Sequence, residues 1–237
     1  MKDKLLYEGK AKQVYTVKDD ETLLVLSYKN DATAFNGAKK ANFDGKGRYN
    51  NLISSKVFDY LHKNGINSHF KKALNDTEQL VERTTIIPLE VVVRNIAAGS
   101  IVNRLGLEEK TRFSEPLVEF FYKKDELNDP FINDAHALLL TDATEEELAQ
   151  IKEMALRVNE KLQVFFKEIH LQLVDFKLEF GRNRNGEIVL SDEVSPDTCR
   201  LWDIETGAKM DKDVFRQDLG DLVTVYDNIL NRLEALQ

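Results

Sequence analysis

The chain has 237 residues, of which 42% are hydrophobic and 31% charged, and its formal net charge at pH 7 is −8. These values are ordinary for a globular protein with one large domain or two small ones, and the acidic balance argues against broad binding to nucleic acids or anionic membranes. The polar start of the sequence, the lack of any run of 18 apolar residues and the single cysteine predict a cytoplasmic protein without an internal disulfide. The four histidines lack the spacing of metal ligands, so we expect no zinc site.

The first third of the chain is predicted to form a small antiparallel sheet. Alternating side chains and short polar turns indicate strands over residues 5–7, 13–17 and 22–28. Residues 30–49 are rich in Gly, Asn, Lys and Asp, which predicts a long, mobile loop. An amphipathic helix is expected over residues 51–63, and Asn64-Gly65 would cap its C-terminal end.

The polarity of the chain changes near residues 82–85, and we expect a boundary between two lobes there. Residues 1–83 would form a β-rich lobe, and residues 84–237 an α+β lobe. The predicted fold is therefore α+β, with a small N-terminal antiparallel lobe, a larger C-terminal lobe and a cleft between them.

Four further elements are predicted in the second lobe. A mostly apolar strand covers residues 89–94, and a short helix follows over residues 99–106. Thr144 and Glu147 form a capping box, which predicts a long helix that ends near residue 170. A last amphipathic helix is expected over residues 212–236.

A predicted hairpin in the second lobe carries the strongest functional signal. Residues 175–180 alternate strictly between charged and apolar side chains, which indicates a strand with one charged face. Asn185-Gly186 favours a two-residue type I′ turn, and in that register Glu179 lies directly opposite Asp192. Two opposed carboxylates repel each other, so this arrangement suits Mg²⁺, which usually takes one or two protein carboxylates together with phosphate oxygens and waters.

Two other interpretations of the hairpin stay open. A loop of three to five residues would shift the register and separate the two carboxylates. The charged face could also be a solvated surface whose carboxylates pair with Lys177. In the first register, Asp175, Lys177, Glu179 and Asp192 together are typical of an ATP–Mg²⁺ clamp, while the lack of an H-R-D-type loop argues against a protein kinase.

A tight turn near the N-terminus is a candidate phosphate site. Lys10 and Lys12 flank this turn at Gly9, where backbone N–H groups can approach a phosphate closely. An exposed, lysine-rich hairpin is the alternative, because the sequence contains no G-x-x-x-x-G-K-[ST] loop and no G-x-G-x-x-G motif.

A second candidate anion site combines a strand end with a helix start. Arg94 ends the strand and Ser100 begins the helix, so a guanidinium and a hydroxyl would meet an aligned helix dipole. Glu90 has the same strand parity and is the alternative, purely structural partner of Arg94. Arg200 could supply a second guanidinium for a phosphate monoester.

Several long motifs resemble the SAICAR synthetase (phosphoribosylaminoimidazole-succinocarboxamide synthase) family. The two longest are IIPLEVVVRNIAAGS at residues 86–100 and LVDFKLEFG at residues 173–181. Residues 7–12, 192–197 and 200–203 are also similar to that family, so the resemblance spans nearly the whole chain. It implies a homodimeric ligase of de novo purine biosynthesis that joins L-aspartate to carboxyaminoimidazole ribotide (CAIR) through an acyl phosphate, at the expense of ATP.

The resemblance further implies that residues 1–83 bind the nucleotide, that residues 84–237 carry the metal and ribotide sites, and that the cleft between the two lobes binds ATP. It also implies roles for individual residues. Residues around ATP and Mg²⁺ would be Lys10, Lys12, Lys123, Glu179 and Asp192, of which Glu179 and Asp192 would be the metal ligands. Residues that face the ribotide would be Arg94, Ser100, Arg200 and, more weakly, Arg216, and the candidate catalytic residues are Lys177 and Asp175. The family often carries His-Asp-Pro where this chain has Asn128-Asp129-Pro130, so no role of that histidine transfers.

The required chemistry predicts what the site must do. A carboxylate is a poor electrophile, and phosphorylation converts it into an acyl phosphate that the amine of aspartate can attack. Residues 30–49 could close over the site and exclude water. The sequence identifies no general base. A small-molecule kinase and a nucleotide-binding regulatory module are the alternatives, and only the ligase would require both CAIR and aspartate for ADP release.

Overall fold

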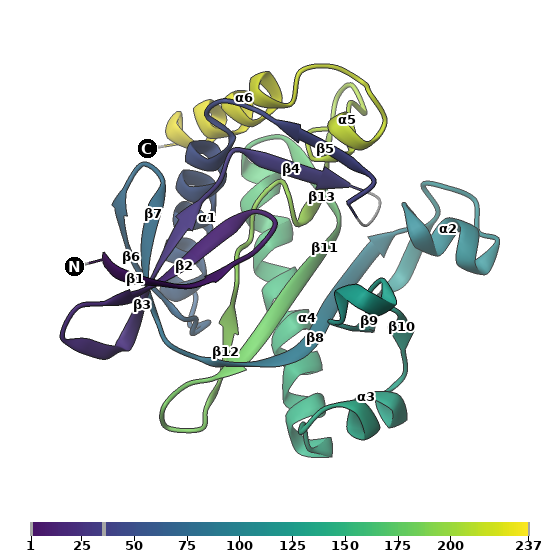
Figure 1. Ribbon diagram of the computed structural model, residues 1–237. Coiled ribbons are helices and arrows are strands. Elements are labelled where there is room, and N and C mark those ends of the chain that lie inside the picture. Colours follow the sequence, from purple (N-terminus) through teal and green to yellow (C-terminus); the bar gives the residue numbers. More distant parts are fainter. Residues whose placement is uncertain (1, 35–36, 237) are drawn as a thin grey trace.

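The computed structural model describes residues 2–34 and 37–236, which form two large antiparallel sheets, a separate two-stranded hairpin and the helices around them (Figure 1). The smaller sheet contains the predicted N-terminal hairpins, in the strand order β1-β2-β3-β7-β6. Its strands are β1 (Lys2–Glu8), β2 (Lys12–Val17), β3 (Asp20–Tyr28), β6 (Phe70–Asn75) and β7 (Glu78–Glu82). The α+β fold predicted from the sequence is confirmed.

The larger sheet has the order β10-β9-β8-β11-β12, and β13 pairs with β11 beyond the end of β12. The two long strands β8 and β11 pair with each other at its centre. Successive side chains of a strand point to opposite faces of the sheet, so alternate residues of β8 and β11 face the smaller sheet. The strands of this sheet are β8 (Thr85–Ile96), β9 (Arg112–Tyr122), β10 (Phe131–Ile132), β11 (Leu171–Arg182), β12 (Ile188–Ser191) and β13 (Cys199–Asp203).

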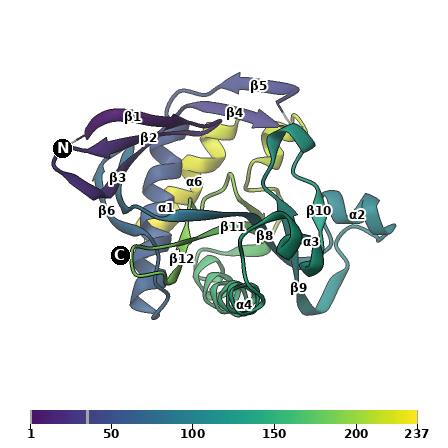
Figure 2. The same cartoon turned by 60° about the horizontal axis from the view of Figure 1, so that its bottom comes forward.

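Helices cover the face of the larger sheet that lies away from β1–β3, as Figure 2 shows for α4. The apolar side chains of α1, α4, β8 and β11 share one core, to which Ile53, Ile151, Val91 and Leu178 belong. The helices are α1 (Lys46–Lys63), α2 (Ser100–Leu105), α3 (Asp134–Leu140), α4 (Glu145–Glu168), α5 (Asp213–Arg216) and α6 (Leu222–Glu234), and η1 (Asp125–Leu127) is a 3-10 turn. No helix of the described residues is both long and apolar enough to span a membrane.

The capping box predicted at the start of the long helix is confirmed. The Thr144 hydroxyl accepts a hydrogen bond from the N–H of Glu147 at 3.2 Å, and the Glu147 carboxylate accepts one from the N–H of Thr144 at 2.9 Å. Helix α4 then continues to Glu168, close to the predicted end. The strand predicted over residues 89–94 is also present and is longer at both ends.

The prediction of a long loop over residues 30–49 is wrong for the residues that the structure describes. Strands β4 (Asp31–Ala34) and β5 (Lys39–Asn42) form a hairpin, and α1 already begins at Lys46. Residues 35 and 36 lie outside the described residues. Ala32 and Ala34 are buried against Phe215 and Tyr226, so contacts with the C-terminal part of the chain order a segment whose composition is typical of a loop.

The single helix predicted over residues 212–236 is also wrong, because α5 and α6 are separated. Gly220 has a φ of 154°, and Asp221 then caps α6 by accepting a hydrogen bond from the N–H of Thr224 at 3.0 Å.

The chain passes from the smaller to the larger sheet between Glu82 and Thr85. A division into lobes at residue 84 stays a prediction.

Candidate active site

A cavity of about 670 Å³ lies between the smaller sheet and the charged face of the larger one. Both sheets contribute to its walls, and the hairpin β4–β5 lines it as well. The predicted site residues in its lining are Lys10, Lys12, Arg94, Lys123, Asp175, Lys177, Glu179, Asp192, Arg200 and Arg216. Ser100 is not part of the lining, but its hydroxyl lies 3.4 Å from Nη2 of Arg94.

The hairpin of β11 and β12 has a different register from the predicted one. Glu179 pairs with Ser191, one position short of Asp192. The loop contains three residues, because the N–H of Asn183 donates to the carbonyl of Glu187 at 2.9 Å. The predicted two-residue turn and the direct opposition of the two carboxylates are therefore wrong.

The side chain of Asn183 explains the longer loop. Its Oδ1 accepts hydrogen bonds from the N–H groups of Asn185 and Glu187, each at 3.0 Å, so the chain curls around this amide. Of the two residues in the predicted turn, only Gly186 has a positive φ, whereas a type I′ turn requires one at both positions.

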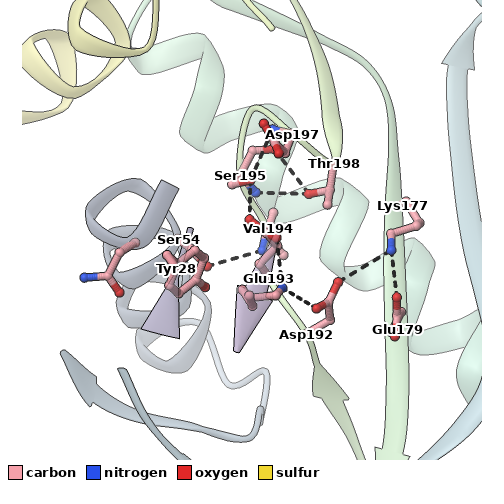
Figure 3. Close-up of polar contacts among 12 residues, drawn as sticks. Tyr28, Ser54, Lys177, Glu179, Asp192, Glu193, Val194, Ser195, Asp197 and Thr198 are labelled. Carbon is pink, nitrogen blue, oxygen red and sulfur yellow. Dashed lines mark hydrogen bonds and ion pairs between the residues drawn. The ribbon is translucent and has the colours of Figure 1, made fainter. Parts of the chain in front are cut away.

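The two carboxylates nevertheless converge on one lysine. Beyond the end of β12, Asp192 adopts a left-handed backbone conformation with a φ of 60°, which turns its side chain into the cavity. The Nζ atom of Lys177 lies 2.7 Å from Glu179 and 3.5 Å from Asp192, as Figure 3 shows. The left-handed conformation of Asp192 thus brings its carboxylate close to that of Glu179, although the two residues are not paired in the strand register.

Lys177 is the cation at the centre of this arrangement. Its Nζ also lies 3.2 Å from Glu90, so three carboxylates surround it. Burial disfavours its charged form, but the charges of Glu179, Glu90 and Asp192 outweigh this effect and hold the pKa of Lys177 well above its usual value. Lys177 therefore stays protonated near neutral pH and can neutralise a developing negative charge, but it is no candidate for the general base.

Further lysines hold the same carboxylates from the other side of the cavity. Lys12 of β2 forms ion pairs with Asp192 and, at 2.8 Å, with Glu193. Burial opposes ionisation of Asp192, but Lys12 and Lys177 outweigh it and keep the pKa of Asp192 well below its usual range. Lys123 lies 2.8 Å from Glu179. The ion pairs of Lys12 thus join the smaller sheet to the segment that follows β12, whereas Lys123, directly after β9, connects that strand's end to β11.

Lys10 and Lys12, which the sequence placed together, have different environments. Lys12 is mostly shielded from solvent beside the two acidic residues, whereas Lys10 is half exposed and lies 2.8 Å from Asp125 in the turn η1. The turn between them closes through a hydrogen bond from the N–H of Gly9 to the carbonyl of Lys12 at 2.8 Å. Lys10 is therefore at the rim of the cavity and Lys12 at its floor.

The opposite end of the cavity holds arginines that alternate with carboxylates. Arg94 lies 2.8 Å from Asp175, and Asp175 also lies 3.0 Å from Arg200. Asp213 then binds Arg200 at 2.9 Å and Arg216 at 2.6 Å. We call this series, Arg94–Asp175–Arg200–Asp213–Arg216, the arginine ladder. Each carboxylate fixes two guanidinium groups, which prepares them for a rigid, multidentate anion such as a phosphate.

The partner of Arg94 differs from the one considered from the sequence. Glu90 pairs with Lys177, and the second carboxylate on Arg94 is Glu119 of β9, whose Oε2 lies 2.6 Å from Nε. Neither Glu119 nor Asp213 was singled out from the sequence. Asp213 lies three residues before Arg216, and this spacing was an available signal; Glu119 is recognisable only from the pairing of β8 with β9.

A glycine allows the arginine ladder to approach α2 closely. Gly99 has a φ of 63°, and a Cβ atom at this position would lie 2.6 Å from Cζ of Arg200. The guanidinium group therefore packs against the bare Cα atom, next to the start of α2 and the hydroxyl of Ser100. Any larger residue at position 99 would displace Arg200.

A buried cluster around Asp197, also missed from the sequence, borders the same cavity. Lys46 of α1 is fully buried and lies 2.6 Å from Asp197, and the hydroxyl of Tyr226 donates to the same carboxylate at 2.6 Å. Lys212 lies 3.4 Å away, and burial lowers its pKa despite the charge of Asp197. Lys46 and Asp197 are far apart in the sequence, so no local pattern connects them.

His69 is another buried residue that the sequence analysis did not single out. Its imidazole lines the cavity, and its Nε2 lies 2.9 Å from the main-chain oxygen of Asp192. Burial lowers the pKa of His69 to about 4, so the ring is neutral near pH 7.

The donor set fits a magnesium ion that arrives with a nucleotide. Among the residues that the structure describes, no group of three or more His, Cys, Asp or Glu side chains is arranged to hold a metal by itself. Glu179 and Asp192 nevertheless meet at Lys177, and two carboxylates with phosphate oxygens and waters are what Mg²⁺ usually binds.

Fold and cavity together define an α+β enzyme with a site for two anionic ligands, one beside the lysines and one beside the arginine ladder. The chain matches the model of the SAICAR synthetase family over residues 5–233, and it belongs to that family. The resemblance of its motifs is thereby confirmed.

Curated relatives and solved structures agree with this assignment. Phosphoribosylaminoimidazole-succinocarboxamide synthase of Oceanobacillus iheyensis is 67% identical over 235 residues, which cover 99% of each chain. The Bacillus subtilis protein of the same name is 54% identical over 236 residues, covering 100% of this chain and 98% of the relative. A SAICAR synthetase solved in complex with ADP matches with a TM-score of 0.92 and 49% identity, covering 95% of this chain and 96% of that one. The solved phosphoribosylaminoimidazole-succinocarboxamide synthase of Ehrlichia chaffeensis matches with a TM-score of 0.95 and 42% identity, covering 98% of this chain and 99% of that one.

The chain is therefore an ATP-dependent ligase that carries out the ligation step of this family in purine biosynthesis. This assignment excludes the two alternatives that the sequence left open, a small-molecule kinase and a regulatory module without turnover.

Proposed function

We propose that the enzyme joins L-aspartate to the carboxylate of CAIR through an acyl phosphate, with ATP and Mg²⁺ as the phosphoryl donor. The observation that carries this proposal is the alternation of Asp175, Lys177 and Glu179 along one face of β11. Asp175 belongs to the arginine ladder and Glu179 to the lysine-rich end. Neighbouring members of this row are about 7 Å apart along the strand, so Lys177 lies between the two anion sites.

The lysine-rich end suits the nucleotide. Lys10, Lys12 and Lys123 would bind phosphate oxygens there, and Glu179 with Asp192 would hold Mg²⁺. The bound ion would offset the charge of the transferred phosphoryl group. The solved relative that contains ADP supports a nucleotide site in this fold.

The arginine ladder suits the ribotide phosphate. Arg94 and Arg200 are held by buried carboxylates and both line this end of the cavity, and the hydroxyl of Ser100 lies beside Arg94. Arg216 extends this positive region through Asp213. A ribotide whose phosphate is bound here would reach back along β11 toward Lys177.

The chemistry then follows from the charges. A carboxylate oxygen of CAIR attacks the γ-phosphorus of ATP, the bond to the bridging oxygen breaks, and ADP leaves. The neutral amine of aspartate attacks the acyl carbon and loses one N–H proton, and phosphate leaves with one of the original carboxylate oxygens and with that proton, as hydrogen phosphate. Lys177 would stabilise the anionic oxygens in both steps. Asp31, Thr33 and Ala34 of the hairpin β4–β5 line the cavity and would limit the access of water to the acyl phosphate.

Oxygen-18 labelling tests this sequence of steps. CAIR labelled in its carboxylate is incubated with ATP, Mg²⁺ and aspartate, and the phosphate released is analysed by mass spectrometry. The proposal expects one labelled oxygen in each phosphate, and repeated turnover of ATP to ADP that depends on both CAIR and aspartate. Unlabelled phosphate, or steady-state ADP formation at the same rate without aspartate, would contradict it.

We also propose a homodimer, as the family resemblance implies. Light scattering in solution tests this, since a dimer has twice the chain mass of 27.2 kDa. A mass equal to that of one chain would contradict the proposal.

A further inference from the structure

Asp192 has a backbone conformation that needs support. It follows the last residue of β12, and its φ of 60° places it in the left-handed region, which is unfavourable for residues other than glycine by about 1–2 kcal/mol. This conformation turns the carboxylate toward Lys12 and Lys177 in the cavity, where Figure 3 shows it beside Lys177. If β12 continued as a regular strand, the side chain would point elsewhere.

The segment of residues 67–69 supports the end of β12. The N–H of His69 donates to the carbonyl of Leu190 at 2.8 Å, and the N–H of Leu190 donates to the carbonyl of Asn67 at 3.3 Å. Ser68 and Leu190 form a short parallel bridge. This backbone pairing stops there, because the carbonyl of His69 accepts from the N–H of Glu82 instead.

The imidazole of His69 continues the support where the backbone pairing stops. Its Nε2 lies 2.9 Å from the main-chain oxygen of Asp192. A carbonyl oxygen only accepts hydrogen bonds, so Nε2 carries the hydrogen and donates it. The ring is 4% exposed and lies edge-on to Phe58 with 5.7 Å between the ring centroids, so its position is fixed by packing.

We propose that His69 is a positioning residue that holds the main chain of Asp192 in its left-handed conformation and thereby aims the carboxylate at the metal–nucleotide site. The inference depends on the proposed function in one respect, that Asp192 binds Mg²⁺ together with the nucleotide. Partners that orient a metal ligand typically change metal affinity 10- to 100-fold when they are removed. His69 would then act on nucleotide binding only through Asp192.

The test compares three variants by calorimetric titration with ADP, with and without Mg²⁺. His69→Leu removes the donor, and we expect it to raise the dissociation constant of ADP in the presence of Mg²⁺ about tenfold or more, with little change in its absence. His69→Gln places an amide N–H near the position of Nε2 and should recover most of the affinity. His62→Leu is the matched control, because His62 bonds to Ser68 of the same segment, at 2.7 Å, but does not reach Asp192.

A double-variant cycle separates positioning from a general effect on folding. In an Asp192→Asn background the carboxylate charge is already absent, so adding His69→Leu should weaken binding of ADP with Mg²⁺ no further. A further loss, or an equal loss without Mg²⁺, would overturn the inference. If His69→Leu does not fold, His69→Asn replaces it, because its amide is too short to reach the same carbonyl.

The result also distinguishes this inference from the proposed function. If wild-type protein binds ADP equally well with and without Mg²⁺, the metal assignment fails. If the wild type depends on Mg²⁺ and His69→Leu keeps the wild-type affinity, only the positioning role of His69 is refuted.

Discussion

Arg94 and Asp175 lie directly opposite each other on β8 and β11, and Nη1 of the arginine is 2.8 Å from Oδ2 of the aspartate. Both residues are only 3% exposed. Because Asp175 also binds Arg200, one carboxylate lies between two guanidinium groups that would otherwise repel each other in a buried environment. The arginine ladder is thus part of the protein's stability as well as a candidate ligand site.

The first prediction follows from this position. Asp175→Asn keeps the shape of the side chain but removes its charge, so the buried guanidinium group of Arg94 and the partly buried one of Arg200 lose their shared partner. We expect the free energy of unfolding, measured with urea, to fall by about 3–5 kcal/mol. Asp142→Asn is the control, because Asp142 also binds an arginine, Arg182, but its side chain is 71% exposed; it should cost less than about 1 kcal/mol. Equal losses in the two variants would show that Asp175 is not a buried charge partner.

A second prediction concerns Gly99. The Cβ atom in Gly99→Ala would meet the guanidinium group of Arg200, so Arg200 must move away from the proposed phosphate site. We expect the KM for CAIR to rise about tenfold or more, while the KM for ATP changes little. Gly106→Ala is the control for a Cβ atom at a positive φ without a clash: its φ is 66° and nothing lies within 4 Å of the added Cβ. Its ψ of 32° places it in the left-handed helical region, whereas Gly99 has a ψ of −135°, so the control tests the positive φ and not the full backbone strain of Gly99. A comparable effect of both variants would argue against displacement of Arg200.

The third prediction concerns Glu179. If it directly opposed Asp192, its removal would relieve repulsion; in the observed structure it instead binds Lys177 at 2.7 Å and Lys123 at 2.8 Å. Glu179→Gln should therefore lower the free energy of unfolding of the ligand-free protein by about 1–3 kcal/mol. It should also raise the Mg²⁺ concentration needed for half-maximal activity. Thermal melting and a magnesium titration measure the two effects, and unchanged magnesium dependence would refute the metal role.

The fourth prediction is a pH dependence of stability from Asp211. Burial and the nearby charge of Asp213 raise the pKa of Asp211 to about 7, whereas an unfolded aspartate has a pKa near its usual value. Between these two values the folded state binds more protons than the unfolded state, so stability falls as the pH rises. The contribution, on the order of 4 kcal/mol, is fully present below about pH 4 and lost above about pH 7.

Asp211→Asn should remove this pH dependence. We expect the melting temperature of the variant relative to wild type to rise between pH 5 and pH 8, as measured by circular dichroism. Asp3→Asn, on an exposed strand, is the control and should follow the wild type at both pH values. A constant difference between Asp211→Asn and wild type would contradict the raised pKa.

Local patterns in the sequence predicted much of the fold. The capping box at Thr144, the strand with alternating charges at residues 175–180 and the N-terminal hairpins depend on residues a few positions apart, so they are visible in the sequence. The hairpin β4–β5 was not predictable in this way, because burial of Ala32 and Ala34 depends on Phe215 and Tyr226 in a distant part of the chain.

In the candidate site, too, local sequence patterns predicted some features and missed those that depend on loop geometry. Motifs and charge alternation identified most of the charged residues that line the cavity, but they predicted the wrong turn and therefore the wrong partner for Glu179. The side-chain bonds of Asn183 decided the loop length, and the left-handed conformation of Asp192 decided where its carboxylate points. Neither the loop length nor the direction of the carboxylate follows from strand periodicity, because periodicity shows only which face of a sheet a side chain occupies and says nothing of loop geometry.

By itself, the sequence determined the α+β class, most of the regular elements and the family, because helix caps, strand alternation and long motifs are properties of contiguous residues. Only the tertiary structure decided how the charges pair. Lys12 and Asp192 are 180 positions apart, and Lys46 and Asp197 are 151 apart. Such pairs form because a charge that becomes buried requires a partner of opposite charge, and which partner is near depends on how the whole chain packs.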